Sequence, residues 1–386
     1  MKSKMMMMMN NDIKFDLNDI TIVPAVFSEI DSRKLVKINF DNGTLPIIVA
    51  PMDTVIDDEN VKLFKDNNLV TCSVRKDKSF LVSSLYDFIG LSLTQFESLV
   101  SDPSDDYVLS NKGFLVDIAS GNLLKLYNLV IEFKKKYPNI PLMIGNIANP
   151  ETYREYCKIL TNIDFIRCSV GSGTVCTTGS NTGIYYPMGS LIKECYDISV
   201  TVNQKRNKES DDIILKKYTP KIIADGGFKN FDDIIKALNL GADYVMLGGI
   251  LAKTLEACGE VYCEDFRFPG DPYHLEKIKI DPSYDHTKIP NNKKIDYFLK
   301  GFNLTRKYRG MSTKEVQKSL GKEKLTTSEG ISKRVHIEYT LTGWIENFDS
   351  YLRSAMAYSN CLTLDDFIGK QNYVHISEQA IQRYKK

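Results

Sequence analysis

The chain of 386 residues lacks several features that would assign it to a functional class at once. Its formal net charge is only +1, with 50 basic and 49 acidic residues spread along the chain, which argues against a nucleic-acid-binding or polyanion-binding surface. The eight cysteines include no CxxC pair. Cys258 and Cys263 are isolated and have few histidines near them, so the sequence does not predict a zinc site.

Long apolar runs are also missing. No segment approaches the ~20 consecutive apolar residues of a membrane-spanning helix. The methionine run Met5–Met9 is followed by Asn-Asn-Asp, and it is shorter than the roughly 7–15 residues of a signal-peptide core. We therefore expect residues 1–12 to form a disordered leader on a cytoplasmic protein whose thiols are mostly reduced.

What the sequence does contain is a regular alternation of short apolar runs with helical patterns. It is 43% hydrophobic, enough for a sizeable core. The runs that read as strands are 46–50, 69–74, 88–91, 113–118, 141–146, 164–167, 221–225 and 243–248. The helical patterns between and after them include 57–67, 93–99, 123–137, 150–160, 232–240 and 251–258.

This alternation predicts an α/β fold built on a (β/α)8 TIM barrel. Continuous apolar strands are buried on both faces, which is typical of parallel sheets. Eight such strands, each followed by a helix, suit a closed barrel. The alternative is an open, doubly wound sheet, but the glycine-rich dinucleotide fingerprint is absent after the first strand. The barrel is therefore the preferred fold.

The domain organisation follows from which parts of the chain show this alternation of strands and helices and which do not. We expect the barrel to span residues 13–261. Residues 262–306 are proline-rich, charged and irregular, which indicates an inserted lobe. Residues 307–335 are polar and interrupted by glycines, which favours a mobile active-site flap. Residues 336–386 contain an amphipathic helix over 343–359 that should pack on the barrel.

Polar residues and glycines lie just past the ends of the predicted strands. In a barrel, the loops that follow the strands form the active face. A single residue there could be a cap or a turn residue, but seven such positions on one face indicate a site. They are Met52-Asp53, Arg75-Lys76, Asp117, Asn146, the loop 171–179, Asp225-Gly226-Gly227 and Gly248-Gly249.

The loop 171–179 carries the most distinctive chemistry. Small residues come first, then Cys176 as a candidate nucleophile, then the hydroxyls of Thr177 and Thr178. Taken alone, it could also be a polar loop with an incidental cysteine. The two glycine pairs can offer backbone N–H groups to a phosphate, although tight turns would also explain them. Asp225 is placed to accept hydrogen bonds from ribose hydroxyls.

Together these stretches resemble the IMP dehydrogenase/GMP reductase family, and they occur in the order found in that family. The resemblance covers roughly residues 15–364, and the combination is far more specific than any one motif. The matching stretches are 50–55, 116–119, 145–148, 171–178 with 182–183, 224–227, 245–249, 308–312 and 328–330.

The resemblance implies a purine-nucleotide enzyme in which Cys176 attacks C2 of the purine and forms a covalent thioimidate. It also implies a homotetramer, and a monovalent cation (K+) held by Gly171, Gly173 and Cys176. It further implies that the 5′-phosphate is bound by Thr174, Gly227, Gly248, Gly249 and Tyr308, and the ribose by Asp225. The base would be bound by Met52, Met311 and Ser312. The nicotinamide end of the cofactor would be bound by Lys76, Asp117 and Asn146.

Two further features distinguish the branches of the family. The segment between Val74 and Asp117 is too short for the regulatory CBS pair of most family dehydrogenases, so no CBS domains are expected. The stretch between Met311 and Glu329 lacks the Arg-Tyr pair with which those dehydrogenases activate water. Both features imply a GMP reductase, which uses NADPH to deaminate GMP reductively to IMP and ammonia, with Thr178 and Glu329 transferring protons.

Two alternatives stay open. A CBS-less IMP dehydrogenase, converting IMP to XMP with NAD, is the first, because some dehydrogenases also have a Glu at the position of Glu329. A purine-nucleotide-binding barrel with impaired catalysis is the second, because several positions depart from the family pattern. Those departures are Ser172 in place of Pro, Gly179 in place of Arg, residues 186–189 in place of a Pro-Gln pair, and Arg75 in place of His.

Overall fold

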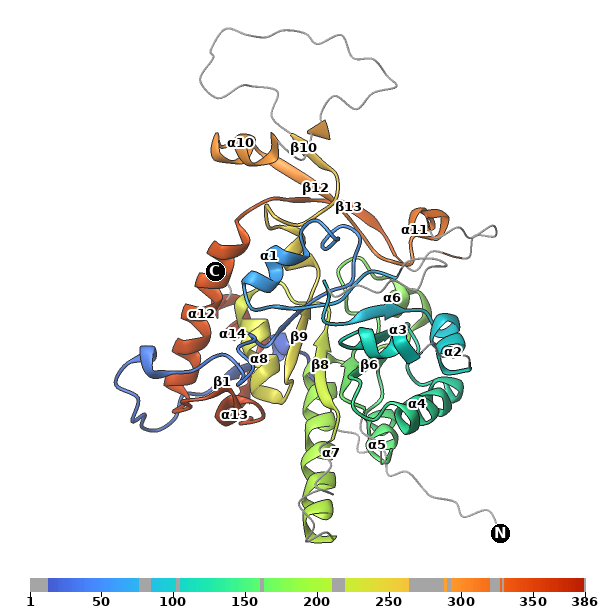
Figure 1. The fold of residues 1–386 in the computed structure, drawn as a ribbon. Coiled ribbons are helices and arrows are strands. Elements are labelled where there is room, and N and C mark those ends of the chain that lie inside the picture. The colour runs from blue at the N-terminus through green and yellow to red at the C-terminus, as the bar shows by residue number, and fades with distance from the viewer. Residues whose placement is uncertain are drawn as a thin grey trace, which may run out of the picture.

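Eight parallel strands form the centre of the molecule in a computed structural model (Figure 1). The structure describes residues 13–75, 85–101, 105–159, 163–209, 219–263, 288–289, 293–319, 327 and 330–384. The predicted leader, residues 1–12, lies outside this part of the chain. The strands are β2 (Ile47–Val49), β3 (Val70–Thr71), β4 (Ile89–Leu91), β5 (Phe114–Asp117), β6 (Leu142–Ile147), β7 (Phe165–Cys168), β8 (Lys221–Asp225) and β9 (Tyr244–Leu247).

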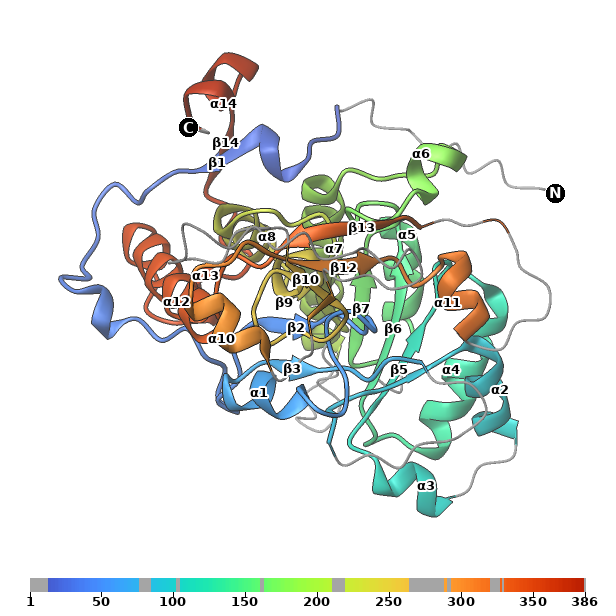
Figure 2. The same ribbon diagram turned by 90° about the horizontal axis from the view of Figure 1, so that it is seen from above.

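The sheet curls round and closes on itself. Its strand order is β3-β2-β9-β8-β7-β6-β5-β4, and every neighbouring pair is parallel. The two outer strands meet through a parallel bridge between Cys72 and Phe88. There the N–H of Ser73 donates to the Phe88 carbonyl at 2.9 Å, and the N–H of Phe88 donates to the Thr71 carbonyl at 3.0 Å. The predicted (β/α)8 barrel is confirmed, and Figure 2 shows its strands from above.

Strand side chains alternate between the barrel interior and the surrounding helices. The interior is apolar along most of its length, where Ile48, Cys72, Phe88, Leu115, Met143, Ile223, Tyr244 and Met246 form one buried cluster. Because inward positions recur every second residue, the positions after Leu115 and Ile223 that also point inward are Asp117 and Asp225. Charged side chains therefore end the apolar interior at the carboxyl ends of the strands.

Helices cover the outside of the barrel (Figure 1). Their apolar faces pack against the outward-facing strand residues to form the larger of the two main cores. The helices that follow or flank the barrel strands are α1 (Val61–Asp66), α2 (Leu93–Ser101), α3 (Asp105–Ser110), α4 (Leu124–Lys136), α5 (Pro150–Cys157), α6 (Thr178–Thr182), α7 (Met188–Glu209), α8 (Phe231–Leu240) and α9 (Gly249–Ala252).

Two helices differ from the sequence-based expectation. The prediction of a helix over 251–258 is wrong, since α9 ends at Ala252. The buried guanidinium of Arg306 explains this end, because it donates to the carbonyl oxygens of Ala252 at 2.7 Å and Thr254 at 2.5 Å. The long helix α7 is not among the predicted ones, although Leu191, Ile192, Cys195 and Ile198 are buried at helical spacing.

A second, antiparallel sheet lies above the carboxyl ends of the barrel strands (Figures 1 and 2). Its strand order is β11-β10-β12-β13. Much of the predicted lobe at 262–306, and residues 320–326 and 328–329 of the predicted flap, lie outside the described residues. The described elements here are β10 (Val261–Cys263), β11 (Lys288–Ile289), α10 (Lys294–Leu299), β12 (Leu304–Arg309), α11 (Lys314–Ser319) and β13 (Ser332–His336).

The two ends of the described chain also pair. β1 (Ile20–Ile22) forms an antiparallel pair with β14 (Tyr373–His375). Within the described residues, no helix has the length and hydrophobicity needed to cross a membrane. The remaining elements are the 3-10 helices η1 (Leu17–Asp19) and η2 (Arg33–Leu35) and the helices α12 (Leu341–Tyr358), α13 (Leu364–Phe367) and α14 (Glu378–Tyr384).

Aspartate side chains link neighbouring strands by hydrogen bonds at the amino-terminal end of the barrel. Asp164, just before β7, accepts the N–H of Leu142 at 2.8 Å and the buried ammonium of Lys134 at 3.0 Å. Asp243, just before β9, accepts the N–H of Ile222 at 2.8 Å. Burial raises the pKa of Asp243 from 3.8 to about 6, against the lowering effect of the Ile222 N–H.

The raised pKa of Asp243 predicts a component of the pH dependence of stability. The folded state binds this proton more tightly than the unfolded state, so the free energy of unfolding should fall as the pH rises from about 3.8 to about 6. Asp243→Asn keeps an oxygen for the Ile222 N–H and removes the titration. Urea unfolding of both proteins across this pH range measures the difference, and parallel profiles for wild type and variant would contradict the prediction.

Candidate active site

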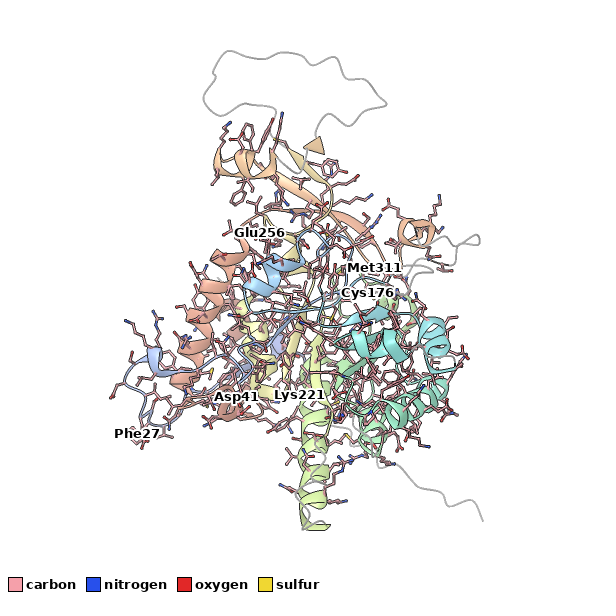
Figure 3. The ribbon with its side chains drawn as sticks, in the orientation of Figure 1. Phe27, Asp41, Cys176, Lys221, Glu256 and Met311 are labelled. Atoms are coloured by element: carbon pink, nitrogen blue, oxygen red, sulfur yellow. The ribbon has the colours of Figure 1, made fainter. Side chains whose placement is uncertain are left out.

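Cys176 lies in the loop that follows β7, at the carboxyl end of the barrel. Figure 3 shows it near Met311 at this end, while Lys221, the first residue of β8, lies at the opposite end. Its side chain is partly exposed, whereas six of the other cysteines are buried and Cys263 is the remaining partly exposed one. The thiol donates a hydrogen bond to Thr178 Oγ1 at 3.4 Å. The predicted nucleophile is thus accessible and has the predicted hydroxyl beside it.

The Cys176 loop is held against the end of β8. The Ser172 hydroxyl donates to the Asp225 carbonyl at 3.1 Å and lies 2.5 Å from the Ser169 hydroxyl. Gly226 and Gly227 have φ angles of +89° and +84°, and a Cβ on either would come within 3.0 or 3.2 Å of Ser172. This glycine pair therefore lets the loop approach the strand. Ser172, which departs from the family pattern, forms a contact between the Cys176 loop and the end of β8.

The residues predicted to bind phosphate converge on one point. A Cβ added at Gly249 would lie 3.4 Å from Thr174 Oγ1 and 3.7 Å from the Tyr308 hydroxyl, and one at Gly248 would lie 3.0 Å from that hydroxyl. Burial raises the pKa of Tyr308, while a hydrogen bond with Thr174 opposes the rise. The Tyr308 phenol therefore stays protonated and can donate a hydrogen bond. Gly227 packs on the same loop from the side of β8.

The residues predicted to bind the base come from two segments on either side of this point. The Tyr308 hydroxyl donates to Met52 Sδ at 3.5 Å. Met311 and Ser312 follow β12 in a turn where the N–H of Gly310 donates to the Ile331 carbonyl at 3.1 Å. The N–H of Ile331 in turn donates to the Val175 carbonyl at 3.0 Å. The second sheet is therefore bonded directly to the Cys176 loop.

Two predicted site residues lie outside the described residues. Glu329 is one of them, and its neighbour Gly330 forms an antiparallel bridge with Cys176. Lys76 is the other, and it follows Arg75 at the end of a described segment. Their roles stay predictions.

A buried arginine, Arg167, joins two of the predicted site residues. Its Nη1 lies 2.6 Å from Asp117 Oδ1, and its Nη2 and Nε lie 2.8 and 3.0 Å from Asp225 Oδ2. Burial would lower the pKa of Arg167, but both carboxylates raise it above its ordinary value. Burial would raise the pKa of Asp117, but Arg167 and Arg75 hold it below its ordinary value. Arg167 and Asp117 are therefore both charged at neutral pH.

Two of the predicted cofactor-binding residues, Asp117 and Asn146, make contacts within this cluster. Asp117 uses its second oxygen on Arg75, whose Nε lies 3.1 Å away, and Asn146 donates from Nδ2 to Asp225 Oδ2 at 2.7 Å. Arg167 was not predicted as a site residue. A signal existed, because a charge inside the run 164–167 takes the inward position two residues after Phe165.

The predicted cation ligands Gly171, Gly173 and Cys176 lie in one turn. The Gly173 carbonyl accepts the N–H of Cys176 at 2.9 Å. Gly171 packs on Gly179, since a Cβ at Gly171 would lie 2.7 Å from the Gly179 nitrogen. Within the described residues, no group of three or more His, Cys, Asp or Glu side chains could hold a metal ion. Cation binding by the loop stays a prediction.

Comparison with known proteins gives a consistent picture. A sequence profile of the IMP dehydrogenase/GMP reductase domain matches residues 110–268. The chain is 31% identical to GMP reductase 2 of Bos taurus over 272 residues, covering 65% of this chain and 72% of that protein. It is 26% identical to GMP reductase 2 of Homo sapiens over 391 residues, covering 96% and 97%. It is 24% identical to GMP reductase of Caenorhabditis elegans, covering 97% and 95%.

Removal of the Arg167 charge should destabilise the fold. In Arg167→Met, Asp225 and Asp117 lose a buried counter-charge, which we expect to cost about 3–5 kcal/mol of unfolding free energy at neutral pH. The deficit should shrink as the pH falls, because Asp117, whose pKa Arg167 no longer lowers, can then take up a proton. Urea unfolding at two pH values measures both effects. Arg167→Lys, which keeps the charge, is the control, and an Arg167→Met protein as stable as wild type would contradict the assignment.

Proposed function

Because the chain belongs to the IMP dehydrogenase/GMP reductase family, we propose that it is a GMP reductase-like enzyme that converts GMP to IMP and ammonia with NADPH. The observation that carries the proposal is the position of Cys176. Its accessible thiol has the Thr178 hydroxyl 3.4 Å away, and the backbone of Cys176 forms an antiparallel bridge with Gly330. The predicted phosphate-binding and base-binding residues surround the same loop.

The nucleotide would lie across the end of the barrel. Thr174, Tyr308 and the N–H groups of the glycine pairs would hold the 5′-phosphate. Asp225 would accept hydrogen bonds from the ribose hydroxyls, with its carboxylate held in place by the ion pair to Arg167. Met52 and the Met311–Ser312 turn would flank the purine. This arrangement would bring C2 of the base to the Cys176 sulfur.

The reaction then follows from the thiol and its neighbours. The Cys176 sulfur forms a bond to C2, while the thiol proton moves to the purine. Thr178 and Glu329 pass this same proton on from the purine to the 2-amino group, which leaves as ammonia and gives the thioimidate. NADPH supplies the hydride that C2 then gains. The carbon–sulfur bond breaks, IMP is released, and the thiolate regains a proton from the medium.

The residues beside the cluster of Arg167 fit a nicotinamide carboxamide. Arg75 Nε is buried and, although close to Asp117, makes no aligned hydrogen bond to any described residue. The Arg75 side chain as a whole is 25% exposed, and its guanidinium would donate to the carboxamide oxygen. Asn146 would lie beside it, with its amide oriented by Asp225. Lys76 follows Arg75 in the chain and completes the proposed group. The homotetramer stays a prediction.

Cys176→Ala should lower the rate of GMP turnover by at least about 10³-fold, because the covalent step is lost. The assay follows NADPH absorbance at 340 nm with GMP, together with ammonia release. Cys263→Ala, which removes the other partly exposed thiol, is the matched control and should leave the rate unchanged. Mass spectrometry of the wild type with GMP should show a nucleotide adduct on Cys176.

The same assay separates the alternatives. Turnover of IMP with NAD but not of GMP with NADPH would replace the proposal with an IMP dehydrogenase. Nucleotide binding with no turnover of either substrate would indicate a binding barrel that has lost catalysis.

A further inference from the structure

Arg309, the last residue of β12, lies in a cluster of alternating charges. Its Nη2 and Nε lie 2.5 and 3.3 Å from the two carboxylate oxygens of Asp53, which is a side-on, two-point contact. Its Nη1 lies 3.0 Å from Glu315 Oε2. Lys307 also reaches Glu315, at 3.0 Å. The hydrogen bond to Asp53 raises the pKa of the Arg309 guanidinium, which therefore stays charged.

This cluster joins three separate segments of the chain. Asp53 follows Met52 in the loop after β2, and Arg309 is separated from it by 256 positions in the sequence. Arg309 comes just before the turn that carries Met311 and Ser312, and Glu315 lies in α11 beyond that turn. The Arg309 and Asp53 side chains are only 20% and 26% exposed. Solvent therefore screens this pair less than a surface ion pair.

We propose that Arg309, by its contacts with Asp53 and Glu315, is a positioning residue that sets the spacing between Met52 and the Met311–Ser312 turn and so fixes the purine base. The inference rests on the proposed function, which places these three residues around the base. The planar guanidinium suits this task, because its two-point contact with a carboxylate fixes both distance and angle. Arg309 itself need not touch the nucleotide.

The role should be confined to the base. The residues that we propose bind the phosphate are Thr174, Tyr308 and the Gly248–Gly249 pair. They contact one another, and none of these contacts involves Arg309. Loss of the Arg309–Asp53 contact should therefore weaken binding of a complete nucleotide and leave binding of the sugar phosphate alone unchanged. A general loss of structure would weaken both.

Titration calorimetry on the full chain with GMP and with ribose 5-phosphate tests this difference. Arg309→Met and Asp53→Asn should each raise the dissociation constant for GMP by about tenfold and that for ribose 5-phosphate by less than about twofold. The double variant should be no worse than Arg309→Met alone, since Arg309→Met already removes the contact that Asp53→Asn weakens. Lys307→Met, on the same strand and paired with Glu315 but not with Asp53, is the control and should bind GMP as wild type does.

The outcomes separate cleanly. GMP binding by Arg309→Met equal to wild type would overturn the proposal, as would an equal loss for GMP and ribose 5-phosphate. If Arg309→Met does not fold, Asp53→Asn decides, because it keeps the guanidinium and removes only the charge it meets. Failure of the wild type to bind any purine nucleotide would overturn the proposed function, and this inference with it.

Discussion

The ion-pair cluster around Arg167 is the constraint on which the site depends. A barrel interior is apolar, and an isolated carboxylate there would take up a proton or cost several kcal/mol. Arg167 lies between Asp117 and Asp225 and makes three contacts of 3.0 Å or less with them. The apolar layers below the cluster exclude water, and the loops above it are free to bind a ligand. The placement of the Asp225 carboxylate, which we propose binds the ribose, is therefore a property of the barrel as well as of one residue.

The Cys176 loop depends in the same way on distant segments. On one side it rests on the Gly226–Gly227 pair, which leaves room for Ser172. On the other it is bonded to the second sheet through Val175 and Ile331. A loop of small residues has little structure of its own, because glycine pays a large entropy cost on ordering. Here the order comes from contacts with β8 and β13.

Much of the fold could be predicted from the sequence, because each barrel strand is an apolar run of the right length between turn residues. The loop residues near Cys176 could be found for the same reason, as they follow the strand ends. The partners of Arg167 and Arg309 could not, since an ion pair between distant segments leaves no local pattern; the local signal at Arg167 was only that a charge stands at an inward position. The end of α9 is a similar case, because it depends on Arg306, more than fifty positions away. Local patterns predict elements well, and they say little about which charges meet.

The second sheet shows how closely the barrel and its additions are combined. β12 (Leu304–Arg309) runs across the predicted boundary between the lobe and the flap at 306/307. Arg306 and Tyr308, two residues apart, both reach the barrel: the first meets the carbonyl end of α9, and the second meets the glycine pair at its start. Arg309 then meets Asp53. One strand thus contacts the proposed phosphate-binding and base-binding parts of the site. Movement of β12 against the barrel would therefore change both parts together, so binding of a nucleotide that contacts both should stabilise the packing of this sheet on the barrel.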